Sequence, residues 1–135
     1  MLYEKAIKEM AERAKAERQA RAREGVKLES IGGVFLTFKP DGKTIQIWYA
    51  GTHRWTVDRV DLIWSIGTIL AGGAAFRLLS MSNRRGYRFD FEWSERDDRI
   101  RLEIEPDHDG EGLGGCWIFE KEEIEKLAWM LGLRG

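Results

Sequence analysis

Residues 87–105, YRFDFEWSERDDRIRLEIE, decide the fold, because they alternate twice between large apolar and charged side chains. Strict alternation predicts strands with one buried and one solvated face, and the polar residues between the two runs predict a turn. We therefore expect an antiparallel hairpin of strands at 87–93 and 99–105. We describe the register by its index sum, the sum of the residue numbers of two paired positions. An index sum of 191 places unlike charges opposite each other at three positions. A sum of 193 sets Asp90 against Glu103 at a cost of roughly 0.2–1 kcal/mol. The charges thus favour the register of 191. They also predict a solvated polar face whose charged side chains pair with one another.

The rest of the chain supplies a second hairpin, two further strands and three helices. Helical periodicity ended by glycine predicts the helices, and runs of β-branched and aromatic residues predict the strands. The helices are expected at 2–24, 58–70 and 121–131, and the remaining strands at 33–38, 44–49, 76–82 and 116–119. The expected fold class is α+β, a single domain with an antiparallel sheet of five to six strands and helices packed on it, in the order α-ββ-α-ββββ-α.

Three local patterns refine this picture. The 33–49 hairpin carries apolar residues on both faces, so we expect each face to be covered by a helix or a partner, and its turn at 40–42 to be a bulged three-residue loop. Helix 58–70 is apolar except for one narrow polar stripe, which predicts a central, buried helix. A loop is expected before it, at 50–55. The ββββα order of residues 76–131 is similar to that of single-strand-binding coactivator and Whirly-type domains, in the order of elements alone.

The amino-terminal helix has an apolar stripe in its first half only. Tyr3, Ile7, Met10 and Ala14 recur at helical spacing, and beyond them the stripe continues as alanine. We therefore expect the first half to dock and the second half to project. The expected organisation is one domain over residues 1–135, with a partly projecting charged helix at 1–25 and a body at 31–135.

Charge divides the chain into a basic and an acidic part. Residues 1–88 hold sixteen Lys or Arg against nine Asp or Glu, and residues 89–135 hold six against fourteen, although the net charge is only −1. One part thus suits an anionic partner and the other a cationic one. Sparse Asn and Gln with abundant Arg and Glu are typical of thermophilic sources.

The basic part indicates contact with nucleic acid. Cationic side chains on the projecting half-helix and at a hairpin tip suit phosphates, and neighbouring aromatic rings suit base stacking. The candidate nucleic-acid-binding residues are Lys15, Arg18, Arg21, Arg23, Arg84, Arg85, Tyr87 and Trp55. The first hypothesis is therefore a non-enzymatic accessory protein that binds nucleic acid or a nucleoprotein complex. A solvated helix and a polar turn remain the alternative interpretation of the same residues.

The acidic part supports a second hypothesis, in which carboxylates imitate phosphates. A protein-directed regulator or inhibitor of a nucleic-acid-processing enzyme would present them to a basic groove, as small phage-encoded antagonists do. The candidate residues are Glu105, Asp107, Asp109 and Glu111. A metal-dependent enzyme ranks third, because these acids do not follow the spacing of a calcium-binding loop.

Signals for catalysis, cofactors and export are absent from the sequence. His53 and His108 are the only histidines and lie in no acid–base or zinc motif, and no phosphate-binding loop is present. We expect no enzyme activity, no cofactor and no metal. The single cysteine, Cys116, excludes an internal disulfide and is expected to be buried. Without a secretory signal or a long enough apolar run, we expect a cytoplasmic protein without membrane contact; a homo-oligomer is compatible with the sequence.

Overall fold

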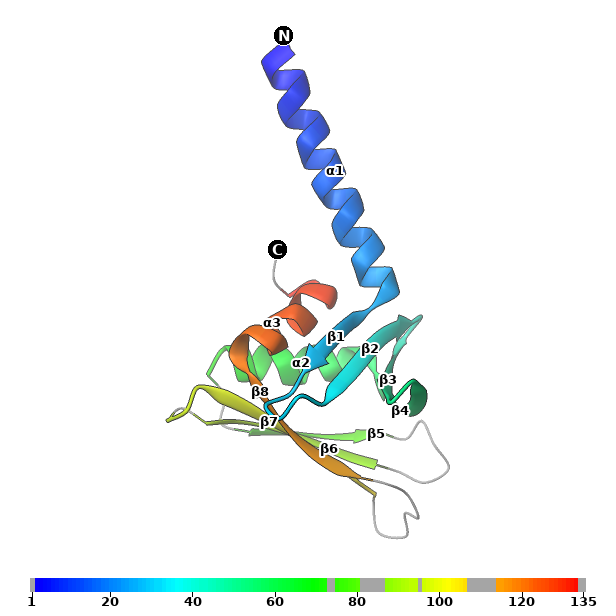
Figure 1. The fold of residues 1–135 in the computed structure, drawn as a ribbon, viewed down its shortest axis with the longest axis vertical. Coiled ribbons are helices and arrows are strands. Elements are labelled where there is room, and N and C mark those ends of the chain that lie inside the picture. Colours follow the sequence, from blue (N-terminus) through cyan, green and yellow to red (C-terminus); the bar gives the residue numbers. More distant parts are fainter. Residues whose placement is uncertain (1, 73–74, 81–86, 95, 107–113, 134–135) are drawn as a thin grey trace.

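The computed structural model describes residues 2–72, 75–80, 87–94, 96–106 and 114–133, with the backbone alone at 17–23 and 75–80. Over this part of the chain the helices are α1 (Leu2–Glu24), α2 (Arg59–Leu70) and α3 (Lys121–Met130). The strands are β1 (Val26–Glu29), β2 (Phe35–Asp41), β3 (Thr44–Tyr49), β4 (Thr52–Asp58), β5 (Ala75–Ser80), β6 (Tyr87–Ser94), β7 (Arg99–Pro106) and β8 (Gly115–Glu120). They form two antiparallel sheets, sheet A in the order β1-β2-β3-β4 and sheet B in the order β5-β6-β7-β8 (Figure 1).

The α+β class is confirmed, but the predicted order and the single sheet are wrong. The observed order is α-ββββ-α-ββββ-α, so that a ββββα unit occurs twice. The expected loop at 50–55 is a two-residue turn followed by β4, because Ala50 and Gly51 both take positive φ, 51° and 75°. A register shift after Ile47 interrupts the alternation that would have revealed β4. Strand β1 has only four residues, too few for a periodic signal.

The turn between β2 and β3 is also shorter than predicted. Asp41 pairs with Thr44, which leaves a two-residue turn instead of a bulged three-residue loop. Gly42 takes the expected positive φ, 61°. Pro40 lies inside β2, opposite Ile45.

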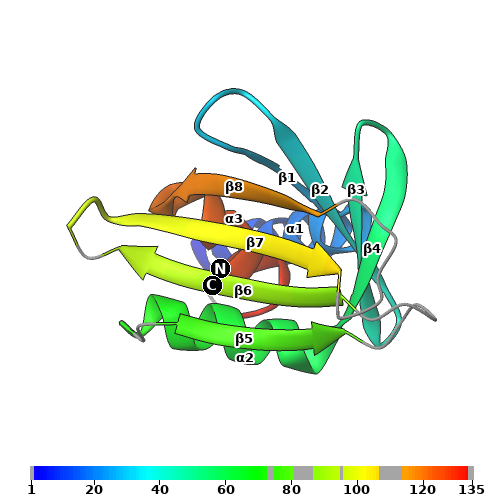
Figure 2. The same cartoon turned by 90° about the horizontal axis from the view of Figure 1, so that it is seen from below.

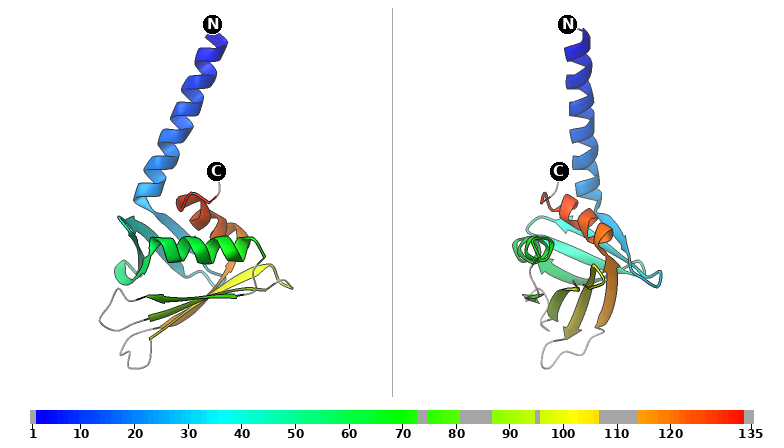
Figure 3. Two further views of the ribbon diagram at one scale, coloured as in Figure 1. Left: turned by 180° about the vertical axis from the view of Figure 1, so that it is seen from behind. Right: turned by 90° about the vertical axis from the view of Figure 1, so that its left-hand side faces the viewer.

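The two central helices tie the sheets together. α2 follows sheet A in the chain but packs chiefly on β5 and β6 of sheet B (Figure 3). α3 follows sheet B, yet β1 of sheet A is the strand that it contacts most. Figure 2 shows the strands of sheet B side by side, with the helices behind them. One apolar cluster includes residues of both sheets and both helices, so each half completes the core of the other.

α2 is half exposed rather than central. Trp64 is 65% exposed, whereas Ser65 from the predicted polar stripe is buried. The Ser65 hydroxyl donates a hydrogen bond to the Asp61 carbonyl, 3.1 Å away, which satisfies it inside the core. No helix in the described part of the chain is both long and apolar enough to cross a bilayer.

The register between β6 and β7 has an index sum of 193, so the predicted sum of 191 is wrong. Asp90 lies opposite Glu103. The turn sets the register of a hairpin, and here Asp98 takes a φ of 53° and accepts a hydrogen bond from the Trp93 ring nitrogen at 3.1 Å. The like-charge pair is tolerated because cations flank it: Arg88 lies 3.4 Å from the Asp90 carboxylate.

α1 meets the body at its carboxyl end and projects from it, so its first half does not dock (Figure 1). Tyr3, Ile7 and Met10 are 77%, 50% and 68% exposed, so the prediction that they are buried is wrong. The reason is the connection: only Gly25 separates α1 from β1, which places the carboxyl end of the helix at the body. The side chains of the arginines in the second half lie outside the described residues.

Candidate nucleic-acid interface

The outer face of sheet A carries two aromatic–cation pairs on an open surface. Antiparallel pairing turns Leu36 and Phe38 of β2 inward together with Ile45 and Ile47 of β3. The alternate residues face outward, and we call six of them the aromatic–lysine face: Lys27, Phe35, Thr37, Lys39, Trp48 and His53. Glu29, opposite Phe35, and Gln46, opposite Lys39, lie on the same side. Phe35 is 43% exposed. The outer side of this hairpin is therefore open within the described chain, and its cover by a partner stays a prediction.

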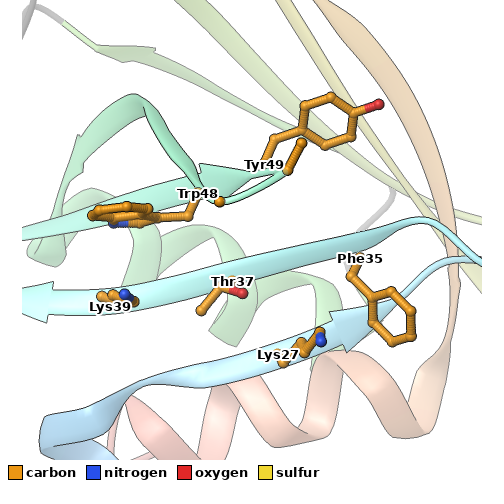
Figure 4. A pocket seen from close by; sticks show the side chains of 8 residues that line it. Lys27, Phe35, Thr37, Lys39, Trp48 and Tyr49 are labelled. Atoms are coloured by element: carbon orange, nitrogen blue, oxygen red, sulfur yellow. The ribbon is translucent and has the colours of Figure 1, made fainter.

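The aromatic–lysine face is hollowed. An open hollow of about 480 Å³ runs over β1, β2 and the end of β3. Figure 4 shows its side chains on neighbouring strands, with Trp48 and Lys39 at one end, Lys27 and Phe35 towards the other, and Thr37 between them. The lining residues are Lys27, Phe35, Thr37, Lys39, Trp48, Tyr49, Ala50 and Gly51. This volume falls in the range of ligand-binding clefts, about 300–1,000 Å³.

Each lysine lies over one ring. Lys27 Nζ is 4.4 Å from the centroid of the Phe35 ring, and Lys39 Nζ is 4.1 Å from the centroid of the Trp48 ring. Such contacts contribute about 0.5–1 kcal/mol at exposed sites. The ammonium groups are therefore held at the rings, but weakly enough to move onto a stronger anionic partner.

Hydrogen bonds along β3 hold the Trp48 indole in place. Its ring nitrogen donates to Gln46 Oε1 at 2.9 Å, and Gln46 Nε2 donates to Asp41 Oδ2 at 3.1 Å. On the neighbouring strand the His53 ring stacks on Trp48, with centroids 5.8 Å apart and planes 19° apart. The indole is thus preorganised.

His53 is held as firmly as Trp48. Its Nε2 lies 2.9 Å from the Trp55 carbonyl oxygen, which only accepts hydrogen bonds, so Nε2 carries a proton. The Thr56 hydroxyl oxygen is 2.7 Å from the same nitrogen. The imidazole ring is therefore held by two polar contacts and by its stacking on Trp48.

A second hollow, of about 340 Å³, shares Tyr49 with the first and lies where the two sheets meet. Arg54, the unpaired residue at the register shift of β4, and Trp117 of β8 also line it. Cys116 contributes to it and is exposed, contrary to the expected burial, because β8 turns Trp117 and Phe119 inward instead.

The structure describes three of the eight side chains that the sequence proposed for nucleic-acid binding. Trp55 is only 3% exposed and packs edge-on against Trp117 at 5.5 Å, so it offers no open ring face for stacking. Tyr87 is half-buried against the core, and Lys15 is exposed on α1, apart from the aromatic–lysine face. Arg84 and Arg85 lie outside the described residues, as do the side chains of Arg18, Arg21 and Arg23.

The acidic candidates are only partly visible. Glu105 is half-buried and forms an ion pair with Arg88 across the hairpin. Asp107, Asp109 and Glu111 lie outside the described residues. The outer face of sheet B continues with Arg101–Glu92 and Arg99–Glu120 ion pairs, so most of the charges described there have partners within the face.

One carboxyl group on sheet B has a perturbed pKa. A hydrogen bond with Glu105 raises the pKa of Glu103, and so do its partial loss of water and the charges of Glu105 and Asp90. Arg101, 3.5 Å from Glu103, opposes this effect. The carboxyl groups of Asp90, Glu103 and Glu105 therefore lie close together on the outer face of sheet B.

The sequence did not predict the aromatic–lysine face, because it predicted apolar residues on both faces of this hairpin. The alternation Phe35, Thr37, Lys39 was visible, but the shorter turn sets which residues of β3 share that side. Among the described residues no three His, Cys, Asp or Glu groups are close enough to hold a metal ion. No family model, curated protein or solved structure matches this chain.

Proposed function

We propose that the protein binds single-stranded nucleic acid on the aromatic–lysine face, without catalysing a reaction. The observation that carries the proposal is the pairing of each of two rings with a lysine around one hollow: the exposed Phe35 with Lys27, and the half-buried Trp48 with Lys39. Rings that stack on bases beside cations that contact phosphates are the usual elements of single-strand binding. Phe35 and Lys39 are four residues apart on β2, about 13 Å, which suits a site on the order of four nucleotides.

The energies favour exchanging the internal contacts for contacts with a strand. Moving a lysine off its ring forfeits about 0.5–1 kcal/mol, whereas stacking a base on an aromatic side chain contributes about 1–3 kcal/mol. The lysines then become available for phosphates. Preorganisation of Trp48 by Gln46 and His53 lowers the entropic cost of stacking.

Base-selective readout is not part of the proposal. Thr37 is the polar side chain between the two lysines in the hollow, and a hydroxyl pairs with any base edge. We therefore expect weak binding with little sequence preference and a marked dependence on salt.

The test is fluorescence anisotropy with a labelled twelve-nucleotide oligothymidylate and its RNA counterpart. Trp48→Ala should weaken binding by about 5- to 100-fold, the value of one stacked base. Trp64→Ala is the matched control, since it removes an exposed tryptophan on α2 and should change nothing. For the double variant Lys27→Ala/Lys39→Ala, the slope of log K against log salt should become shallower by about 1.4, or 0.7 per phosphate contact.

Two outcomes contradict the proposal: no binding of either strand at 20 mM salt, or equal affinities of Trp48→Ala and wild type. The protein-directed hypothesis through Glu105 and its acidic neighbours would then be preferred, and a pull-down after nuclease digestion tests it directly.

A further inference from the structure

The amino-terminal half of α1 presents an apolar stripe that nothing in the described structure covers. Tyr3, Ile7 and Met10 are all at least half exposed, and Ala14 continues the stripe. α1 has 23 residues and thus extends about 34 Å (Figures 1 and 3). In proteins, a helix gains most of its stability by packing an apolar face against another element. The stripe therefore has the properties of an interface.

We infer that the occupant of this stripe is α1 of a second copy, packed antiparallel. The spacing of Tyr3, Ile7, Met10 and Ala14 is four, three and four residues, which corresponds to d, a, d and a positions of a coiled coil. Antiparallel pairing with an index sum of 17 sets Tyr3 opposite Ala14 and Ile7 opposite Met10. The large Tyr3 thus meets the small Ala14, Ile7 meets Met10 of similar size, and the four layers close on themselves about a two-fold axis.

Charge distinguishes this arrangement from a parallel one. Residues 2–14 hold three acidic and three basic side chains, so two copies of this segment do not repel each other. A parallel pair would set Arg13 against Arg18 of the second copy, at g and e positions, and would align the two helix dipoles. The antiparallel pair sets Glu4 beside Ala11 and Arg13 beside Ala6, without a like-charge contact.

The interface is small, which is typical of weak association. Four apolar layers belong to the small class of interfaces, below about 1,200 Å² in total. We therefore expect a dimer that dissociates on the order of 10 µM. The seam has its centre between residues 8 and 9, so the two bodies lie about 50 Å apart, at opposite ends of the joined helices.

This inference does not rest on nucleic-acid binding, because its readout is the mass of the protein alone. A dimer would nevertheless carry two aromatic–lysine faces, and a strand long enough to reach both would bind more tightly than either face allows.

Sedimentation velocity of the full chain from about 1 to 300 µM tests the proposal. Wild type should shift from the 15.6 kDa monomer toward twice that mass. Ile7→Lys should stay monomeric throughout the range. Ala16→Lys is the matched control, since it adds the same charge to the same helix about 150° away from the stripe, and it should dimerise like wild type. A wild type that is monomeric at 300 µM, or an Ile7→Lys variant that still dimerises, overturns the proposal.

Cross-linking tests the orientation. In a Cys116→Ser background, Ile7→Cys mixed with Met10→Cys should form a disulfide-linked pair when oxidised with copper phenanthroline, because these positions share a layer. Tyr3→Cys alone should form no disulfide-linked pair, because only a parallel arrangement brings Tyr3 close to Tyr3 of the second copy. The reverse result overturns the antiparallel arrangement. Circular dichroism of each variant checks that the body stays folded.

Discussion

Replacing Gly25 by alanine should destabilise the protein more than its small size implies. Gly25 has a φ of 93°, a conformation that costs an L-residue about 1–2 kcal/mol. A Cβ atom there would lie 2.3 Å from the Phe38 carbonyl oxygen and 3.1 Å from Lys39 Cα, both in the backbone of β2. Relieving that overlap requires a backbone shift of about 1 Å, which costs about 1–3 kcal/mol more.

The sum, about 2–5 kcal/mol, should lower the melting temperature by about 6–20 °C for a chain of this length. Gly33→Ala is the matched control, because Gly33 has a similar φ of 82° with no atom within 4 Å of the added Cβ. It should incur only the conformational cost, a loss of about 3–8 °C. Thermal unfolding followed by circular dichroism measures both. If Gly25→Ala melts no lower than Gly33→Ala, the close approach of α1 to β2 does not constrain the fold.

Two further predictions concern sheet B and the core. The pKa of Glu103 is raised above its ordinary value of 4.5, so at pH values above 4.5 this carboxyl group holds its proton more in the folded protein than in the unfolded chain. The contribution of Glu103 to the free energy of unfolding therefore falls as the pH rises from 4.5 through the raised pKa. Glu103→Gln should therefore be more stable than wild type at pH 7, by up to about 1 kcal/mol, with the gain lost near pH 4; equal urea midpoints at pH 7 would contradict the like-charge argument. Trp55→Ala should cost about 3–5 kcal/mol in urea unfolding because the ring is in the core, whereas Trp64→Ala should stay within about 0.5 kcal/mol. Similar costs for the two would mean that Trp55 is not buried as described.

Local patterns predicted the elements whose signals are contained within a few residues. The alternation of residues 87–105 gave both strands of the central hairpin and the faces they present, since the index sums 191 and 193 have the same parity. The prediction that glycine follows the end of the last helix is also confirmed. Gly132 lies just after α3 with a φ of 82°, and the Leu133 amide donates a hydrogen bond to the Ala128 carbonyl, 2.9 Å away. Such features depend on backbone conformation and burial at neighbouring positions, which a sequence displays directly.

The proposed binding face could not be predicted from the sequence, because it is built from strands whose pairing is not local. Lys27 belongs to the four-residue strand β1, and it reaches Phe35 only because β1 pairs with β2. His53 joins Trp48 through a strand that the register shift hides. The basic residues chosen from the sequence were instead those that stood out along the chain, on α1 and at a hairpin tip.

The sequence by itself determined the α+β class, the alternating hairpin, the helices and their glycine ends, because each follows from periodicity or from a single backbone conformation. Only the tertiary structure decided the division into two sheets, the register of β6 and β7, and which half of α1 meets the body. Those outcomes depend on turn geometry and on contacts between residues far apart in the chain. There, differences of about 1 kcal/mol between alternative pairings are decided by the whole core rather than by any local pair.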